Sequence, residues 1–304
     1  MKFVMLPKVW EEPAEELEAA GHERVESVDD ADFLFFSGGA GDLPELPKNI
    51  RFVQTTYAGM DGLAEAGLLT DAVRWANAGG LYADTVAEST LALMLGAGHL
   101  YKFATARASW STQDEAQEKT DFLFHDKTVA IVGAGGIGRR LIELLEPFGV
   151  RVVAVNRSGR DVAGADEVTT FDELGEVWGR ADYVVLLAPL TEETRGLVGK
   201  KELEAMKDSA FLVNAGRGGL VDTDALVEAL RGGAIAGAAL DVTAPEPLPD
   251  DHPLWGLENC LITPHVANTI PMMHALTGRL AVDNARAFEA GEKMPTEVDP
   301  KAGY

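Results

Sequence analysis

Residues Thr128 to Gly138 read TVAIVGAGGIG, an almost continuous apolar run followed by a glycine-rich turn. The turn satisfies G-x-G-x-x-G, a weak signal by itself in a chain with 32 glycines. Here it directly follows a predicted buried strand and opens the apolar helix 137–148, a context typical of a dinucleotide-binding βαβ unit. Such a turn brings the backbone close to a pyrophosphate, and the helix N-terminus donates N–H groups to it. We therefore expect dinucleotide contacts from Gly133, Gly135, Gly136, Ile137 and Gly138.

Outward from this unit, short apolar runs alternate with helix-like segments along almost the whole chain. Such alternation predicts an α/β fold with parallel sheets and helical crossovers. The expected strands are 3–6, 33–36, 52–54, 73–76, 128–132, 150–155, 183–187, 210–213, 236–242 and 260–263. The expected helices are 14–20, with Gly21 as its C-cap, 137–148, 200–206, 224–230 and 271–290.

A further long helix is expected from Thr85 to about Phe103. Thr85-Val86-Ala87-Glu88 fits the capping box, in which a hydroxyl and a carboxylate satisfy free N–H groups at a helix start. A helix of this length is too long for a simple crossover in a small α/β unit. We therefore expect it to carry the chain into a second domain.

Composition excludes several classes of protein. The 304 residues are 46% hydrophobic, which allows two cored domains and excludes global disorder. A single cysteine, Cys260, excludes a disulfide framework and a multi-cysteine metal cage, so we expect no metal and a buried thiol. No apolar run approaches the roughly 20 residues of a membrane span, and the N-terminal apolar stretch is too short for a signal peptide. We expect a cytoplasmic protein.

The formal net charge of −23 is large for this length. No basic footprint for nucleic acid is visible in the sequence. The acidic residues are scattered in short clusters such as Glu11-Glu12, Asp29-Asp30 and Asp250-Asp251. A solvated acidic surface adds self-repulsion that salt screens, and our hypothesis is a salt-rich cytoplasm, as in halophiles.

The end of the second strand of the βαβ unit indicates which dinucleotide is preferred. NAD-selective sites usually end this strand in Asp or Glu, which binds the ribose hydroxyls. Here the strand ends in Val155-Asn156-Arg157-Ser158, without a carboxylate. Arg157 suits a 2′-phosphate, and Asn156 and Ser158 can donate hydrogen bonds to it. The sequence therefore predicts a preference for NADP(H), with NAD(H) possible; the alternative is a merely solvated Arg157.

Three polar side chains follow three of the later strands. Arg217 follows strand 210–213, Glu246 follows strand 236–242, and His265 follows strand 260–263. Ligands of open α/β sheets bind beyond the carboxyl ends of the strands. We therefore expect the three side chains at one sheet edge, near the nicotinamide.

A guanidinium, a carboxylate and an imidazole at one edge suit the reduction of a 2-keto acid. Hydride addition to a ketone creates an alkoxide that needs a proton donor, and His is the usual donor near neutral pH. A neighbouring Glu favours the protonated imidazole, and Arg binds a carboxylate bidentately. We predict Arg217, Glu246 and His265 as catalytic, although each singly also suits a salt bridge, a solvated acid or a capping residue.

The chain resembles the D-isomer-specific 2-hydroxyacid dehydrogenase family over nearly its whole length. The motifs that carry the resemblance are Gly133–Gly138, Leu187–Gly196, Val213–Val221, Asp241–Pro247 and Thr263–Val266. The resemblance implies reversible reduction of 2-keto acids to D-2-hydroxy acids, with Arg217 as carboxylate anchor and His265, partnered by Glu246, as general acid/base. It implies cofactor contacts from Ala188, Pro189, Thr194, Ala215, Gly216 and Asp241, and substrate-binding backbone amides at Ala58, Gly59 and Met60. The family's usual Gly after the catalytic His motif is replaced, because the chain reads His265-Val266-Ala267-Asn268.

The resemblance also implies the domain organisation. A Rossmann cofactor domain, 100–271, is expected to interrupt a smaller flavodoxin-like substrate domain formed by 1–99 and 272–304, with a cleft between them. The family usually dimerises through the cofactor domain and the long helix, so we expect a homodimer.

Two alternatives share this frame. One is another compact family enzyme, such as a glyoxylate/hydroxypyruvate reductase or a phosphoglycerate, formate or phosphonate dehydrogenase. The other is a nucleotide-sensing binding protein, as in family members that act as transcriptional corepressors. The sequence leaves the identity of the keto acid open.

Overall fold

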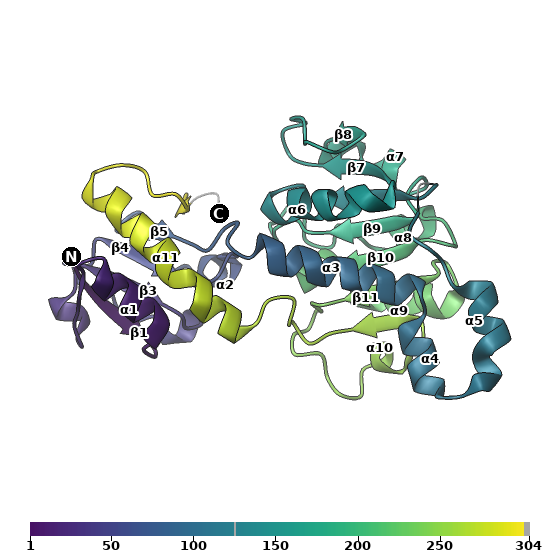
Figure 1. Ribbon diagram of the computed structural model, residues 1–304, viewed down its shortest axis with the longest axis horizontal. Helices are drawn as coiled ribbons and strands as arrows, with labels where there is room; N and C mark the ends of the chain where they lie inside the picture. Colours follow the sequence, from purple (N-terminus) through teal and green to yellow (C-terminus); the bar gives the residue numbers. More distant parts are fainter. Residues whose placement is uncertain (125, 301–304) are drawn as a thin grey trace. The chain divides into compact units, whose positions relative to one another are not determined.

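The computed structural model describes residues 1–124 and 126–300, which form two compact units. Unit 1 contains Met1–Tyr82 and residues 268–300, and unit 2 contains the described residues of Ala83–Ala267. Both are α/β, as the sequence predicts (Figure 1). Residues 83–99 thus group with unit 2, and the boundaries expected at 99/100 and 271/272 stay a prediction.

Unit 2 contains a seven-stranded sheet in the order β12-β11-β10-β9-β6-β7-β8. Its strands are β6 (Thr128–Val132), β7 (Arg151–Val155), β8 (Glu167–Thr169), β9 (Tyr183–Leu186), β10 (Phe211–Asn214), β11 (Gly237–Leu240) and β12 (Cys260–Ile262). Every pairing in this sheet is parallel. The order reverses between β6 and β9, which is the switch point of a Rossmann fold.

Helices cover both faces of this sheet, because alternate strand residues point to opposite sides. Val129 and Ile131 pack in one core cluster with α3 (Ala83–Gly98) and α6 (Gly136–Leu145), while Ala130 and Val132 pack in the other. That second cluster includes residues of α7 (Leu174–Val177), α8 (Lys200–Ala205), α9 (Thr223–Gly232) and α10 (Pro253–Gly256). Burial on both faces accounts for the nearly continuous apolar strands.

Unit 1 contains a six-stranded sheet in the order β13-β5-β4-β3-β1-β2. Its strands are β1 (Lys2–Leu6), β2 (Glu23–Arg24), β3 (Phe33–Phe36), β4 (Phe52–Thr55), β5 (Arg74–Ala76) and β13 (Glu297–Val298). Only the edge pairing of β13 with β5 is antiparallel; the other strands follow the flavodoxin-like order. The helices are α1 (Glu11–Ala19), α2 (Asp61–Glu65) and α11 (Ile270–Glu289), and α1 packs against α11. Gly21 has φ +90° just after α1, consistent with its expected role in ending that helix.

The long helix expected from Thr85 differs from the observed one. Helix α3 begins at Ala83, so Thr85 lies inside its first turn and is not the N-cap of a capping box. The helix ends at Gly98, and Leu100, with φ 55°, separates it from α4 (Tyr101–Arg107). The apolar periodicity continues across a break that only the backbone reveals.

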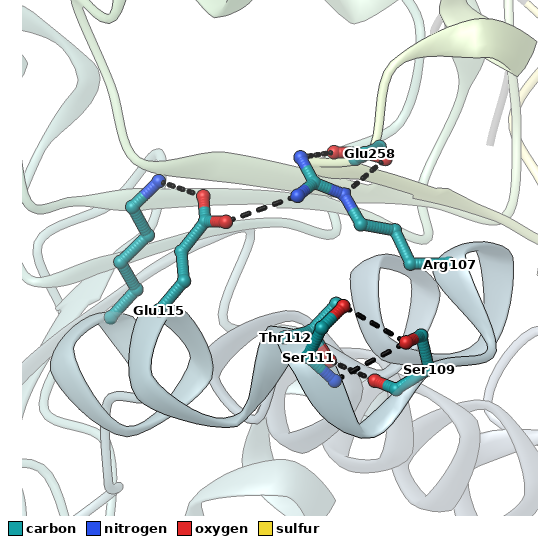
Figure 2. Close-up of polar contacts among 7 residues, drawn as sticks. Arg107, Ser109, Ser111, Thr112, Glu115 and Glu258 are labelled. Carbon is teal, nitrogen blue, oxygen red and sulfur yellow. Dashed lines mark hydrogen bonds and ion pairs between the residues drawn. The ribbon is translucent and has the colours of Figure 1, made fainter.

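A helical hairpin, residues 101–120, follows α3 and comprises α4, a short 3-10 turn and α5 (Gln113–Lys119). Arg107 is its main anchor: its guanidinium donates to Glu258 at 2.8 and 2.9 Å and to Glu115 at 3.1 Å (Figure 2). Lys102 Nζ donates to the carbonyls of Trp255 and Cys260, at 2.9 and 2.7 Å. These contacts fix the hairpin to the chain around β12.

The structure bears on three compositional expectations. Cys260 is fully buried, as expected of a structural thiol. Within residues 1–124 and 126–300, no cluster of His, Cys, Asp or Glu has the geometry to hold a metal ion. No helix in these ranges is long and apolar enough to span a membrane.

Candidate active site

The glycine-rich turn lies at the switch point of the unit 2 sheet. Gly133 has φ +103°, and a Cβ there would lie 2.4 Å from the backbone nitrogen of Ala188, in the loop after β9. Only glycine fits this crossing of the two loops. By contrast, a Cβ on Gly135 would meet nothing within 4 Å, and α6 begins at the next residue. Open space beside free helical N–H groups is what a pyrophosphate requires, so these residues fit a dinucleotide.

The loop after β7 is a compact turn organised by Asn156. Its Oδ1 accepts from the backbone N–H of Ser158 at 3.0 Å, and its Nδ2 donates to the Arg160 carbonyl at 2.9 Å. Arg157 is exposed in this turn, and its Nη2 lies 3.9 Å from Glu193 Oε2. The side chain of Asn156 thus holds the turn, and Arg157 and Ser158 are the exposed groups that a 2′-phosphate would meet.

The loop after β9 uses Thr194 internally. The Thr194 hydroxyl donates to the Pro189 carbonyl at 2.6 Å and accepts from the backbone N–H of Thr191 at 2.8 Å. Its side chain is buried. Thr194 therefore shapes the Ala188-Pro189 segment, and direct contact with a cofactor stays a prediction.

Arg217 follows β10 in a turn fixed by Asn214. The side chain of Asn214 accepts from the Gly216 N–H at 3.1 Å and donates to the Arg217 carbonyl at 2.9 Å. The Arg217 side chain donates to the Gly216 carbonyl at 2.8 Å. A Cβ on Gly218 would overlap the Thr243 carbonyl, so the turn packs directly on the chain after β11.

His265 and Glu246 form a close pair. His265 Nδ1 lies 2.5 Å from Glu246 Oε1, and both side chains are about half exposed. The pair comes from the loops after β12 and β11, and Arg217 comes from the loop after β10. Because these strands are parallel neighbours, all three residues lie at the same carboxyl edge of the sheet, as the sequence predicts.

Asp241 holds the loop that carries His265. Its buried carboxylate accepts from the Thr263 hydroxyl at 2.6 Å and from the Val266 and Ala267 N–H groups at 2.9 and 3.0 Å. The His265 N–H donates to the Asp241 carbonyl at 2.8 Å, and His265 adopts φ 52°. A left-handed conformation is costly for a non-glycine residue and persists where neighbouring contacts impose it. Asp241 therefore orients the imidazole, a role that the sequence did not reveal; its expected contact with the cofactor stays a prediction.

The expected substrate loop, residues 56–60, follows β4 in unit 1. The N–H groups of Ala58, Gly59 and Met60 donate no hydrogen bond to the residues that the structure describes. Tyr57 caps the loop by donating its hydroxyl to the Ser37 carbonyl at 2.7 Å. The loop thus offers unused backbone donors of the kind that bind a carboxylate.

Comparison with known proteins agrees with this geometry. Residues 90–267 match the model of the D-isomer specific 2-hydroxyacid dehydrogenase, NAD binding domain. The chain belongs to the D-isomer specific 2-hydroxyacid dehydrogenase family. It is therefore an oxidoreductase with a Rossmann fold that binds a nicotinamide dinucleotide.

The relatives of this dehydrogenase cover most or all of its length. The uncharacterized protein in the proB 3′ region of Corynebacterium melassecola is 55% identical over all of both chains. Glyoxylate reductase of Aeropyrum pernix is 33% identical over 85% of this chain and 79% of its own. Among solved structures, the D-isomer specific 2-hydroxyacid dehydrogenase of Xanthobacter autotrophicus Py2, in complex with NADPH and MES, has a TM-score of 0.83 at 26% identity and covers 100% of this chain and 99% of its own.

Proposed function

We propose that this dehydrogenase reduces 2-keto acids to D-2-hydroxy acids, reversibly, with NADPH preferred over NADH. The observation that carries the proposal is the pairing of His265 Nδ1 with Glu246 Oε1 at 2.5 Å, on the sheet edge that also presents Arg217. An imidazole held by a carboxylate through one nitrogen keeps the other nitrogen available for proton transfer. The guanidinium provides a bidentate site for a substrate carboxylate.

Each group has one role in the reaction. A reduced nicotinamide dinucleotide, which the glycine turn 133–138 would hold, would supply the hydride for C2 of the keto acid. Arg217 binds the substrate carboxylate and so orients C2. The backbone N–H groups of residues 58–60 are the donors that the proposal assigns to the substrate from unit 1. His265 donates the proton from Nε2 to the carbonyl oxygen as the alkoxide forms, and Glu246, in contact with Nδ1, orients the imidazole for that transfer. In the reverse direction His265 accepts the hydroxyl proton.

The choice of substrate panel follows from the relatives. Several of them are glyoxylate reductases, including that of Pyrococcus furiosus, so glyoxylate and hydroxypyruvate are the first candidates. We would follow the loss of NADPH absorbance with these acids, pyruvate, and branched and aromatic keto acids, and determine the configuration of each product. Formation of a D-hydroxy acid supports the proposal. NADPH binding without oxidation by any member of the panel would contradict it and favour a nucleotide-sensing role.

The preference for NADP rests on Arg157 and the turn that Asn156 organises. We expect Arg157→Ala to raise the Kd for NADPH roughly tenfold or more, the effect of losing a charge-assisted contact to phosphate. The Kd for NADH should be unchanged, because NADH has no 2′-phosphate. Arg231→Ala, an exposed arginine at the end of α9, is the matched control. An equal rise of the Kd for NADPH and the Kd for NADH in Arg157→Ala would refute the assignment.

We also propose that the enzyme is a homodimer that associates through the helical hairpin. Trp110 at the hairpin tip is 88% exposed, beside a groove of about 600 Å³. The groove is lined by Ala104, Ala108, Ser109, Trp110, Thr112, Gln113, Ala116, Gln117, Thr120 and Phe122, none of them charged. In a chain of net charge −23, an uncharged surface is where a second copy meets least repulsion. A projecting aromatic next to a groove on the same element also suits a two-fold contact.

Sedimentation tests the dimer. The native protein should sediment as a dimer at micromolar concentration, and Trp110→Ala should shift it toward monomer. Val9→Ala, an exposed apolar residue of unit 1, is the control and should leave the dimer intact. A native protein that sediments only as a monomer would overturn the proposal.

A further inference from the structure

The substrate loop is held by its carbonyl groups. Three consecutive carbonyls accept hydrogen bonds from the segment that follows β5: Thr56 from the Tyr82 hydroxyl at 2.6 Å, Tyr57 from the Ala78 N–H at 2.9 Å, and Ala58 from Asn77 Nδ2 at 2.8 Å. Because segment 77–82 binds the carbonyls of the loop, the N–H groups of residues 58–60 stay available for a ligand. Segment 77–82 therefore acts as a template for the loop.

Asn77 is the side chain at the start of this template, and both ends of its amide are used. Its Nδ2 donates to the Ala58 carbonyl, and its Oδ1 accepts from the Gly79 N–H at 2.9 Å. These two contacts fix the orientation of the amide, because the reverse orientation would oppose two donors and two acceptors. A Cβ at Gly79 would lie 2.9 Å from Asn77 Oδ1, so a side chain there would displace the Asn77 amide.

A buried amide network fixes Asn77 in turn. Gln54 on β4 donates to the Asn77 carbonyl at 3.0 Å and accepts from Asn284 of α11 at 2.6 Å. Thr296 Oγ1 donates to the same carbonyl at 2.6 Å and accepts from Asn284 at 2.8 Å. Gln54 and Asn284 are 1% and 0% exposed, so these bonds are sheltered from water and leave Asn77 little freedom.

We propose that Asn77 is a positioning residue for substrate binding: it holds the Ala58 carbonyl and thereby keeps the N–H groups of residues 58–60 in the arrangement that binds the substrate carboxylate. This inference rests on the proposed function, because it takes residues 56–60 as the substrate loop. Asn77 contacts no reacting atom in this assignment and acts only through the backbone of the loop.

The first test is Asn77→Ala. Removing the donor leaves a carbonyl without its partner, and we expect KM for the keto acid to rise about tenfold with a smaller change in kcat. The Kd of oxamate, a non-reducible keto-acid analogue, on the NADPH complex should rise by the same factor. The Kd for NADPH should be unchanged, because the glycine turn and the Arg157 turn belong to unit 2.

Two further variants separate positioning from general damage to the fold. Gly79→Ala keeps Asn77 but displaces its amide, and should raise KM in the same direction. Asn77→Asp replaces the donor with an anionic oxygen, but its protonated acid can donate to Ala58 again. The ratio of its KM to the KM of the native enzyme, measured at each pH, should therefore fall toward 1 as the pH drops from about 8 to about 5.5. Asn77→Ala should show no such recovery.

Asn49→Ala is the matched control. Asn49, in the same unit, also donates its amide to two carbonyls, those of Val28 and Ala31, both at 2.7 Å, but outside the substrate loop and its template. It should leave KM and the oxamate Kd unchanged. The proposal would be overturned if Asn77→Ala kept the native KM and the native oxamate Kd, or if these two constants rose equally in Asn49→Ala.

A readout without turnover keeps this inference distinct from the proposed function. Hydrogen exchange of the Ala78 N–H, which donates to the Tyr57 carbonyl, should be faster in Asn77→Ala than in the native protein. If the native enzyme turned over no keto acid, the proposed function would fail while faster exchange still supported the role of Asn77 in the loop. Unchanged exchange would overturn that role whatever the activity.

Discussion

Two loops of this dehydrogenase follow parallel strands at the carboxyl edges of two different sheets, and opposite chemical groups hold them. In unit 2, the buried carboxylate of Asp241 accepts hydrogen bonds from the loop that carries His265. In unit 1, neutral donors from segment 77–82 satisfy the carbonyls of the substrate loop. The first loop is held by its donors and the second by its acceptors.

The difference follows from what each loop presents. The His265 loop presents a side chain, so its backbone N–H groups are free to bind Asp241. The proposed substrate loop keeps its backbone N–H groups for an anion, so only its carbonyls remain for anchoring. Asp241→Asn should therefore leave an N–H group of the His265 loop without its acceptor. Asn77→Asp should leave a carbonyl of the substrate loop without its donor.

The largest effect should come from removing the imidazole that the first loop presents. We expect His265→Ala to lower kcat by roughly 10²–10⁴-fold, the range for losing a general acid–base group. The oxamate Kd should stay nearly native, because the second loop is intact. His99→Gln, which removes an imidazole just after α3, is the control. A near-normal kcat in His265→Ala would refute the site assignment.

Arg217→Ala should come next, since it removes a carboxylate contact that both binds and orients the substrate. Steady-state kinetics should show a higher KM and a lower kcat, with kcat/KM reduced roughly 10²-fold. Arg195→Ala, in the loop after β9, serves as the comparison. A rise in KM with native kcat would mean that Arg217 binds the substrate without orienting it.

Asp241→Asn should have a moderate effect. The amide keeps one acceptor oxygen but turns an N–H group toward a backbone donor of the loop. One buried N–H then lacks its partner, and we expect kcat to fall about tenfold and Tm to decrease. The oxamate Kd should change less than in Asn77→Asp. The reverse order of these two Kd changes would contradict the distinction between the two loops.

Salt should change the stability of the whole fold more than it changes the hydrogen bonds that hold either loop. The anchors of both loops are buried and little screened, whereas the net charge of −23 is spread over exposed side chains. Removing molar salt should lower Tm, as measured by calorimetry, through unscreened repulsion. A Tm that is independent of salt would refute the hypothesis of a salt-adapted protein.

The smallest effect is expected for alkylation of Cys260, which lies on β12, the strand that leads to the His265 loop. Burial raises the pKa of its thiol to about 12, so the thiol stays protonated at neutral pH. Alkylation by iodoacetamide, followed by mass spectrometry, should be slow in the native protein and fast in urea. Rapid native alkylation without loss of activity would show that β12 opens locally.

Much of the fold could be predicted from the sequence, because it depends on local periodicity. The apolar runs located ten strands, among them β3 and β6 at their observed limits. Strand β8, Glu167-Val168-Thr169, was missed because an edge strand needs no continuous apolar run. The break between α3 and α4 was also missed, because Leu100 carries no sequence signal for a left-handed conformation.

The proposed catalytic residues and the glycine turn could be predicted from the sequence alone, since the proposed chemistry needs an imidazole, a guanidinium and a phosphate-binding turn at the carboxyl ends of strands. The tertiary structure alone decided what holds them. Asp241 lies 25 residues from Val266, and Asn284 lies 230 residues from Gln54. Such contacts depend on which strands become neighbours and which helix covers them, and that arrangement comes from packing the whole unit rather than from any local pattern.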